Sequence, residues 1–477
     1  MESKRERVEA MSALDALLFR GDEHPRMLSV VGGLYLLDGE PARRRMMQSL
    51  DRASRAFPRL RQRVVVPPLR LVLPHWVTDP GFVLADHVRY VRVEAPGSLT
   101  EVLDAVRPEL SAPLDPDRPL WEALLMTGLE GRQCALLFRM SHAMTDGIGA
   151  IRMLEALFDD SPAPARKRMP PPPPAGMAEP TDVQARAFAR MPQEAIDGAV
   201  RALPGLFDAV LSATRDPVSF VRSTEKQLAS LRRVLSLPCS PARALSGRGY
   251  ARRCMIVRVP LPALKRASRK LESSVNDLYL AAIAGALRRY QSAVGVDPED
   301  VPVAVPVNLR RGDESAPGNY IGALTLAAPA SEPDVSRRLA AIRQAVRAGR
   351  AEPAIQAHSS IAPLLARMPD TVLERLLASI PRADVQASNV PGPATRPFFA
   401  GRRVRAVYPF GPVPGVGAMI TMLSLADECF VAVHFDPASF ARPETFASCL
   451  RRGFTEVLEA GGQSAMIAEP ILDHGAP

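Results

Sequence analysis

The sequence predicts an α/β protein of two lobes, and three features support this prediction. A chain of 477 residues is longer than one hydrophobic core usually organises, so two units that share an interface are expected. Apolar runs of strand length alternate with helix-period patterns in both halves. Between the halves lies a proline-rich segment, residues 161–180, whose five consecutive prolines (170–174) cannot continue a helix or join a sheet ladder.

The N-terminal lobe is expected over residues 1–160. Apolar runs at 28–37 and 135–140 predict strands, and the patterns at 100–110 and 148–158 predict helices. Residues 161–244 then form a linker and a helical crossover, because apolar residues recur at helical intervals over 181–236. The arginines beside these helices leave a membrane-surface helix as an alternative, although packing against the protein itself is the more frequent arrangement.

The C-terminal lobe is expected over residues 245–477. Its predicted strands are 254–259, 301–307, 321–327 and 430–435, and a strong helical pattern fills 274–290. No internal repeat with a period of 20 to 50 residues is visible.

The charge of the chain is a weak functional signal. Lys and Arg total 60 against 51 Asp and Glu, which gives a net charge of +9, and 55 of the 60 basic residues are scattered arginines. This bias is typical of a GC-rich genome. Attraction to anionic lipid surfaces or to the phosphates of a carrier cofactor is the alternative. Nucleic acid is an unexpected partner, because no helix-turn-helix, zinc-finger or basic-aromatic pattern is present.

Cysteine usage and the N-terminus favour a cytoplasmic location. The five cysteines are widely separated and form no C-x-x-C pair, which is typical of a reducing compartment. The charged N-terminus lacks the apolar core of a signal peptide, and no run of about 18 apolar residues occurs.

The motif that carries chemistry lies between a predicted strand and a predicted helix. The sequence ALLFRMSHAMTDGIGAIRMLEALF places His142, Asp146 and Gly147 at the strand-to-helix junction, which holds a side chain rigidly while leaving it accessible. A neutral imidazole can take a proton from an alcohol as the alcohol attacks a carbonyl. For an isolated His-x-x-x-Asp pattern, a buried histidine satisfied by hydrogen bonds would be the better interpretation.

Residues 119–147 resemble the bacterial wax ester synthase/diacylglycerol acyltransferase family, within the chloramphenicol acetyltransferase-like superfamily. The hallmark of that family is His-His-x-x-x-Asp-Gly, and here Ser141 replaces the first histidine. Further matches follow in the same order along the chain: MSALDALLF near the start, Pro119-Leu120-Trp121, Asn276-Asp277, Pro306 to Arg310, Gly318-Asn319 and SNVPGP at 388–393. The series is spread over nearly 400 residues, covers both halves and is more specific than any single motif.

The resemblance implies two chloramphenicol acetyltransferase-like lobes, each a mixed sheet with flanking helices, and an active-site tunnel between them. It also implies transfer of an acyl group from acyl-CoA, or another acyl thioester, to a hydroxyl acceptor such as a fatty alcohol or diacylglycerol. A natural-product acyltransferase with a hydroxyl or amine acceptor and a catalytically weak homologue that binds acyl chains or carrier thioesters remain as alternatives.

The resemblance and the chemistry of the residues together give expected roles to ten residues. His142 is the expected general base and Asn276 the expected donor to the oxyanion or orienter of the acceptor. Structural roles at the active site are expected for Ser141, Asp146, Gly147 and Arg310, with Arg310 as the ion-pair partner of Asp146. Substrate contacts are expected for Trp121, Asp277, Ser388 and Asn389. Packing for Trp121, helix capping for Asn276 and a turn for SNVPGP are the alternatives.

No metal or bound cofactor is expected, since the remaining histidines have no partner at ligand spacing and no Gly-rich phosphate loop or G-x-S-x-G elbow occurs. Acyl-CoA would enter as co-substrate. The expected location is cytoplasmic, with peripheral contact to membranes or lipid bodies as a further possibility.

Overall fold

The computed structural model describes residues 9–24, 27–67, 72–145, 156–163, 169–172, 237–308, 321–351 and 382–475, together with the single residues 149, 153, 362, 365, 366, 368 and 373. The crossover helices expected over 181–236 lie outside the described residues, as does most of the helix expected over 148–158.

The first lobe is built on a six-stranded sheet with the order β12-β13-β2-β7-β6-β5. Its strands are β2 (Val30–Leu37), β5 (Val88–Arg92), β6 (Trp121–Thr127), β7 (Cys134–Ser141), β12 (Phe398–Phe399) and β13 (Arg402–Phe410). All neighbours are antiparallel except β5 and β6. The lobe also contains α1 (Ala13–Gly21), α2 (Arg43–Ala56), α3 (Leu99–Ser111) and a small sheet of β1 (Glu9–Ala10), β3 (Gln62–Val65) and β4 (His75–Thr78).

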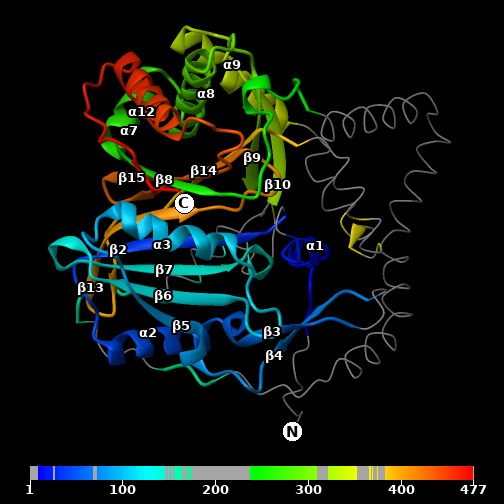
Figure 1. Cartoon of the computed structure of the whole chain (residues 1–477), viewed down its shortest axis with the longest axis vertical. Helices are drawn as coiled ribbons and strands as arrows, with labels where there is room; N and C mark the ends of the chain where they lie inside the picture. Colours follow the sequence, from blue (N-terminus) through cyan, green and yellow to red (C-terminus); the bar gives the residue numbers. More distant parts are fainter. Residues whose placement is uncertain are drawn as a thin grey trace, which may run out of the picture.

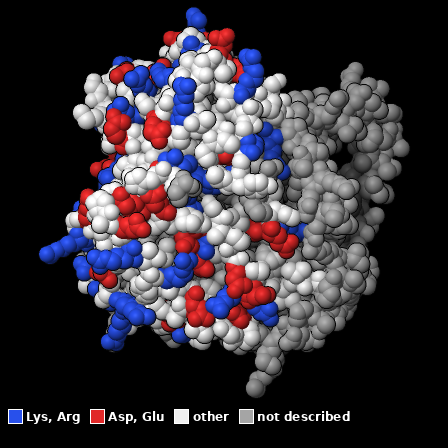
Figure 2. Space-filling model, in the orientation of Figure 1, with Lys and Arg blue, Asp and Glu red and all other residues white. Residues whose placement is uncertain are grey.

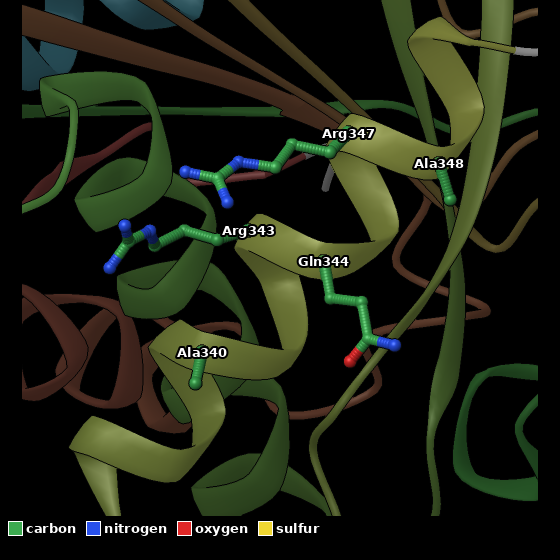
Figure 3. Close-up of a pocket in the computed structure, with 5 residues that line it drawn as sticks. All are labelled: Ala340, Arg343, Gln344, Arg347 and Ala348. Atoms are coloured by element: carbon green, nitrogen blue, oxygen red, sulfur yellow. The ribbon is translucent and has the colours of Figure 1, made fainter.

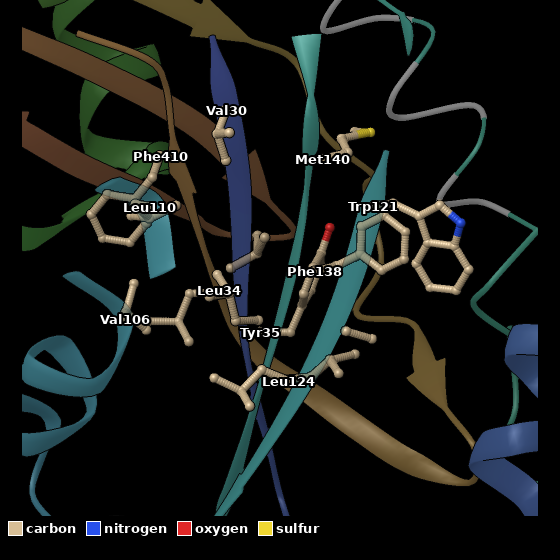
Figure 4. Close-up of a cluster of buried hydrophobic side chains, with 14 of the residues drawn as sticks. Val30, Leu34, Tyr35, Val106, Leu110, Trp121, Leu124, Phe138, Met140 and Phe410 are labelled. Atoms are coloured by element: carbon tan, nitrogen blue, oxygen red, sulfur yellow. The ribbon is translucent and has the colours of Figure 1, made fainter. Parts of the chain in front are cut away.

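Helix α3 shows how the sequence builds this lobe. Ser98 and Glu101 form a capping box that satisfies the first backbone N–H groups of the helix. Its apolar residues recur at helical spacing, and Figure 4 shows Val106 and Leu110 pointing toward Leu34 of β2 and Phe410 of β13. One face of α3 is therefore buried against the first sheet.

The second lobe has a seven-stranded mixed sheet with the order β10-β9-β11-β14-β15-β8-β16. Its strands are β8 (Arg253–Pro260), β9 (Val301–Asn308), β10 (Ile321–Ala328), β11 (Val385–Val390), β14 (Ala418–Leu425), β15 (Glu428–Phe435) and β16 (Ile471–Leu472). Figure 1 shows α7 (Leu261–Lys270), α8 (Val275–Ala293), α9 (Val335–Arg350) and α12 (Pro443–Ala460) together on one side of this sheet.

The two lobes share strands as well as an interface. The expected division placed residues 398–410 in the second lobe, but β12 and β13 join the sheet of the first lobe, because β13 pairs antiparallel with the free edge of β2. Ile256, Phe430 and Ala432 of the second sheet belong to the apolar core of the first lobe. The second half of the chain therefore completes the first lobe.

Charge on the described surface is mixed. Figure 2 shows Lys and Arg interspersed with Asp and Glu on the visible face. On that face, the arginine excess is not gathered into one basic surface. Among the described residues, no helix combines the length and apolar character needed to cross a bilayer.

His434 of β15 is a buried histidine with a perturbed pKa. Its side chain is 3% exposed, its Nδ1 lies 3.3 Å from the carbonyl oxygen of Gly411, and burial lowers its pKa to about 4. Between pH 6.5 and 4 the unfolded chain therefore binds a proton that the folded chain does not, so the free energy of unfolding falls as the pH falls through this window.

We expect His434 to contribute about 2 kcal/mol to the loss of stability between pH 7 and pH 5. Denaturant unfolding of the parent and of His434→Gln at both pH values measures this contribution. The variant should lose less stability over the interval than the parent. Equal losses in the two proteins would contradict the assignment, whatever the stability of the variant at pH 7.

Candidate active site

His142 lies where β7 ends. It opens a 3-10 turn, His142–Met144, in which Ala143 and Met144 are fully buried. The backbone N–H of His142 donates to the carbonyl oxygen of Ser29 at 2.9 Å, and the hydroxyl of Ser141 accepts from the N–H of Ala143 at 3.2 Å. The imidazole is partly exposed while its backbone is held on both sides, as expected for a catalytic side chain on a rigid element.

Asp22 ties this turn to the start of β2. One carboxylate oxygen accepts from the N–H and the hydroxyl of Ser29, at 2.6 and 2.7 Å, and the other accepts from the hydroxyl of Ser141 at 2.5 Å. Burial raises the pKa of Asp22, although these hydrogen bonds and the nearby His142 act in the opposite direction. Asp22 therefore positions both backbone segments that hold His142.

A cavity of about 140 Å³ opens beside His142. Its walls come from both lobes, with β2, β7 and β13 on one side and β11 and β14 on the other. The lining residues are Val31, Gly32, Gly33, Tyr35, Phe138, Met140, His142, Thr145, Ser388, Val390, Val407, Pro409, Phe410, Gly411, Pro412, Met419, Thr421 and Leu423. The lining is mostly apolar with a few polar groups, which is typical of a small-molecule site.

A second cavity, of about 510 Å³, lies along α9. Figure 3 shows its described lining, which comes from this one helix: Ala340, Arg343, Gln344, Arg347 and Ala348. This lining offers neither a base nor a nucleophile, so the cavity beside His142 is the candidate active site.

Strand β11 places two expected substrate-binding residues on opposite faces of the sheet, because side chains alternate along a strand. Ser388 lines the cavity beside His142. Asn389 faces the helices, where its side-chain N–H donates to the side-chain oxygen of Asn276 at 3.4 Å. Asn276 is not among the residues that line the cavity. Its role at the oxyanion stays a prediction.

Asp277 belongs to the cap of α8. Its carboxylate accepts from the N–H of Ser274, and the hydroxyl of Ser274 accepts from the N–H of Asp277. Ser274 is therefore the N-cap of this helix, a role that the sequence had suggested as an alternative for Asn276. A substrate contact for Asp277 stays a prediction.

Trp121 packs against Phe138, a residue of the cavity wall. It is 1% exposed, donates its indole N–H to the carbonyl oxygen of Leu60 at 2.8 Å, and stacks between His87 and Phe138 at centroid distances of 4.8 and 5.3 Å. Phe138 lines the cavity, whereas Trp121 does not. This arrangement favours the packing alternative for Trp121 over a direct contact with substrate.

Comparison with known proteins identifies the family. The model of the wax ester synthase/diacylglycerol acyltransferase catalytic domain matches residues 11–279, and the model of the C-terminal domain of the same family matches residues 317–457. The chain belongs to the wax ester synthase/diacylglycerol acyltransferase family. It is an O-acyltransferase, which transfers an acyl group to a hydroxyl acceptor.

Relatives with similar sequences agree with membership of this family. A Mycobacterium tuberculosis protein provisionally named a diacylglycerol O-acyltransferase is 39% identical over 97% of this chain and 94% of its own length. A second M. tuberculosis protein of the same provisional name is 30% identical over 88% of this chain and 89% of its own.

The solved structures show the fold. The wax ester synthase/diacylglycerol acyltransferase of Marinobacter aquaeolei VT8 has a TM-score of 0.63 at 22% identity, covering 95% of this chain and 100% of that one. The first condensation domain of the calcium-dependent antibiotic synthetase has a TM-score of 0.62 at 16% identity, covering 98% of both chains. The predicted two-lobe, chloramphenicol acetyltransferase-like fold is thereby confirmed.

Within this family pattern, Ser141 takes the place of the first histidine, and its hydroxyl is committed to Asp22 and to the turn. Asp146, Gly147 and Arg310 lie outside the described residues, so their expected roles stay predictions.

Two residues of the site were not predicted from the sequence. Asp22 lies just after the MSALDALLF segment, and Thr421 lies on a strand that was not predicted. Within the described ranges, no group of three or more His, Cys, Asp or Glu side chains could hold a metal ion.

Proposed function

We propose that His142 is the general base for transfer of an acyl group from acyl-CoA to the hydroxyl of a fatty alcohol or diacylglycerol. The observation that carries this proposal is the place of His142 on the wall of a largely apolar cavity formed by both lobes. Apolar acyl chains suit such a lining, and a base held on a rigid turn can meet an acceptor hydroxyl there.

The reaction proceeds as a direct displacement, in which the acceptor itself attacks the thioester and no acyl-enzyme forms. The imidazole of His142 takes the acceptor proton while the acceptor oxygen forms a bond to the thioester carbonyl carbon. The tetrahedral oxyanion then collapses, the carbon–sulfur bond breaks, and the imidazolium returns its proton to the thiolate of CoA. Electrons and protons balance without a further reactant, so acyl-CoA acts as co-substrate and no bound cofactor is needed.

The choice of substrates rests on relatives of this chain. The two M. tuberculosis relatives, at 39% and 30% identity, are named, provisionally, diacylglycerol O-acyltransferases. A double mutant of the starter condensation domain of rhizomide synthetase, which has the same fold at 16% identity and a TM-score of 0.59, was solved in complex with C8-CoA and Leu-SNAC. We place the enzyme in the cytoplasm, in peripheral contact with membranes or lipid bodies where such acceptors reside.

A matrix of donors and acceptors tests the proposal. Thiol release is measured with acyl-CoAs of short, medium and long chain, each combined with a fatty alcohol, a diacylglycerol, an amine or no acceptor. We expect acceptor-dependent release with the alcohol or the diacylglycerol. Release with the amine alone would favour the natural-product alternative. Binding of acyl-CoA without release for any pair would favour the acyl-binding homologue.

A further inference from the structure

Thr421, in the middle of β14, carries a buried hydroxyl that the protein leaves unsatisfied. The side chain is 5% exposed, and its Oγ1 has no hydrogen-bond partner within the described residues. Most buried polar side-chain atoms in folded proteins have a partner, because an unpaired one has lost its hydrogen bonds to water without replacement. An exception of this kind requires an explanation.

The hydroxyl belongs to the wall of the reaction cavity. Thr421 lines the same cavity as His142 and lies opposite Ser388 in the register of β14 and β11. Alternation along β14 turns Met419, Thr421 and Leu423 toward the cavity and Ile420 and Met422 toward the core of the second lobe. The unpaired hydroxyl therefore lies on the side of the sheet that faces the candidate base.

Gly411 leaves space beside this hydroxyl. A Cβ atom at position 411 would lie 3.2 Å from Thr421 Oγ1 and 2.6 Å from the terminal carbon of Met419. Any larger residue at position 411 would crowd the hydroxyl and displace Met419. Glycine at this position keeps room beside Oγ1 for another group.

Packing alone does not account for threonine at position 421. Valine has nearly the same shape, suits a strand equally well and carries no hydroxyl to leave unpaired. A threonine here lowers the stability of the empty protein relative to valine. A substrate with a hydrogen-bonding group that enters the cavity would give this hydroxyl a partner.

We propose that Thr421 is a catalytic residue whose hydroxyl donates a hydrogen bond to the carbonyl oxygen of the acyl thioester. The bond strengthens as that oxygen gains negative charge during attack of the acceptor, and the proton stays on Thr421 throughout. A donor fixed in a largely apolar cavity stabilises such an oxyanion more than it would in water. This inference rests on the proposed function, in which the displacement takes place beside His142.

The test uses Thr421→Val, Thr421→Ser and, as a matched control, Thr455→Val. Thr455 lies on α12, and its hydroxyl donates to the carbonyl oxygen of Arg451. For each variant, kcat and KM are measured by thiol release with the acyl-CoA and acceptor that the parent uses, and Tm is measured without substrate.

Thr421→Val is expected to lower kcat about 10²- to 10³-fold with KM within a few fold of the parent, because the lost bond acts mainly in the transition state. Its Tm should equal or exceed that of the parent, since the unpaired hydroxyl is gone. Thr421→Ser keeps the O–H group and should stay within about ten-fold of the parent kcat. Thr455→Val should keep the parental kcat.

Four results would overturn the inference. Parental kcat in Thr421→Val would show that the hydroxyl is not used. Equal losses in the valine and serine variants, or a loss accompanied by a lower Tm, would show that Thr421 acts through packing. A higher KM with unchanged kcat would reduce its role to ground-state binding. His142→Ala, measured in parallel, separates these results from failure of the proposed function: if His142→Ala stays active, the role of His142 as general base fails, whereas a loss in His142→Ala with parental kcat in Thr421→Val overturns only the inference on Thr421.

Discussion

Replacing His142 by alanine is expected to lower kcat at least about 10²-fold while leaving Tm close to that of the parent. General-base catalysis typically contributes about 10²- to 10⁴-fold to a rate, and the alanine variant loses this contribution. The fold should survive, because the imidazole is partly exposed and the backbone of the turn is held through Ser29 and Ser141. Thiol release and thermal unfolding, measured on the same preparation, test both parts.

Ser141→Ala is the matched comparison for His142→Ala. Its expected loss of kcat is smaller, because Ser141 donates to Asp22 and caps the turn without contacting a base of its own. Near-parental turnover in His142→Ala would remove His142 from the mechanism. An acyl adduct on Ser141, detected by mass spectrometry during turnover, would replace direct displacement by a covalent route.

Much of the fold could be predicted from local patterns. The expected strands at 135–140, 254–259, 301–307, 321–327 and 430–435 correspond to β7, β8, β9, β10 and β15, and the patterns at 100–110 and 274–290 correspond to α3 and α8. Each of these elements has the apolar periodicity of its own secondary structure, so the residues within the segment suffice to identify it.

Lateral pairing between distant strands could not be predicted in this way. Strand β13 belongs by sequence to the second half, yet its residues pair with Gly32–Leu37 of the first half, a contact that no local pattern encodes. The cavity depends on this pairing of β13 with β2, because Val407, Pro409 and Phe410 of β13 form part of the cavity wall.

Only part of the candidate site could be predicted, because some of it depends on how distant strands pair. The motif located His142. Which of Ser388 and Asn389 points into the cavity depends on the register of β11, and a shift of one residue would turn Asn389 toward the cavity in place of Ser388. Asp22 gave no signal because its importance lies in contacts with Ser29 and Ser141, which follow only from the folded chain. Thr421 is recognised by a missing partner, which a sequence does not record.

Replacing Asp22 by alanine is expected to lower both stability and turnover. The variant leaves the N–H and hydroxyl of Ser29 and the hydroxyl of Ser141 without their acceptor, and each buried donor left unpaired costs about 1–3 kcal/mol. Because some of these donors will find water, we expect a total loss of about 2–4 kcal/mol in the free energy of unfolding.

The expected loss of turnover follows from the same contacts. Ser29 accepts the backbone N–H of His142, and Ser141 precedes His142 in the chain, so the imidazole shifts when both serines lose Asp22. A displacement of about 1 Å at a reacting group can lower a rate about 10²-fold. Turnover of Asp22→Ala should therefore fall about 10- to 100-fold even at temperatures where the variant is fully folded.

Two further variants complete the test of Asp22. Asp22→Asn keeps one acceptor oxygen, so its stability and turnover should lie between those of the parent and the alanine variant. Asp115→Ala removes an exposed carboxylate that accepts from a backbone N–H and pairs with Arg118, and it should leave stability and turnover nearly unchanged.

One result would contradict the positioning role of Asp22. If Asp22→Ala lost stability but kept parental turnover when folded, the carboxylate of Asp22 would stabilise the lobe without positioning His142. The orientation of the imidazole would then have to come from β7 and its turn alone.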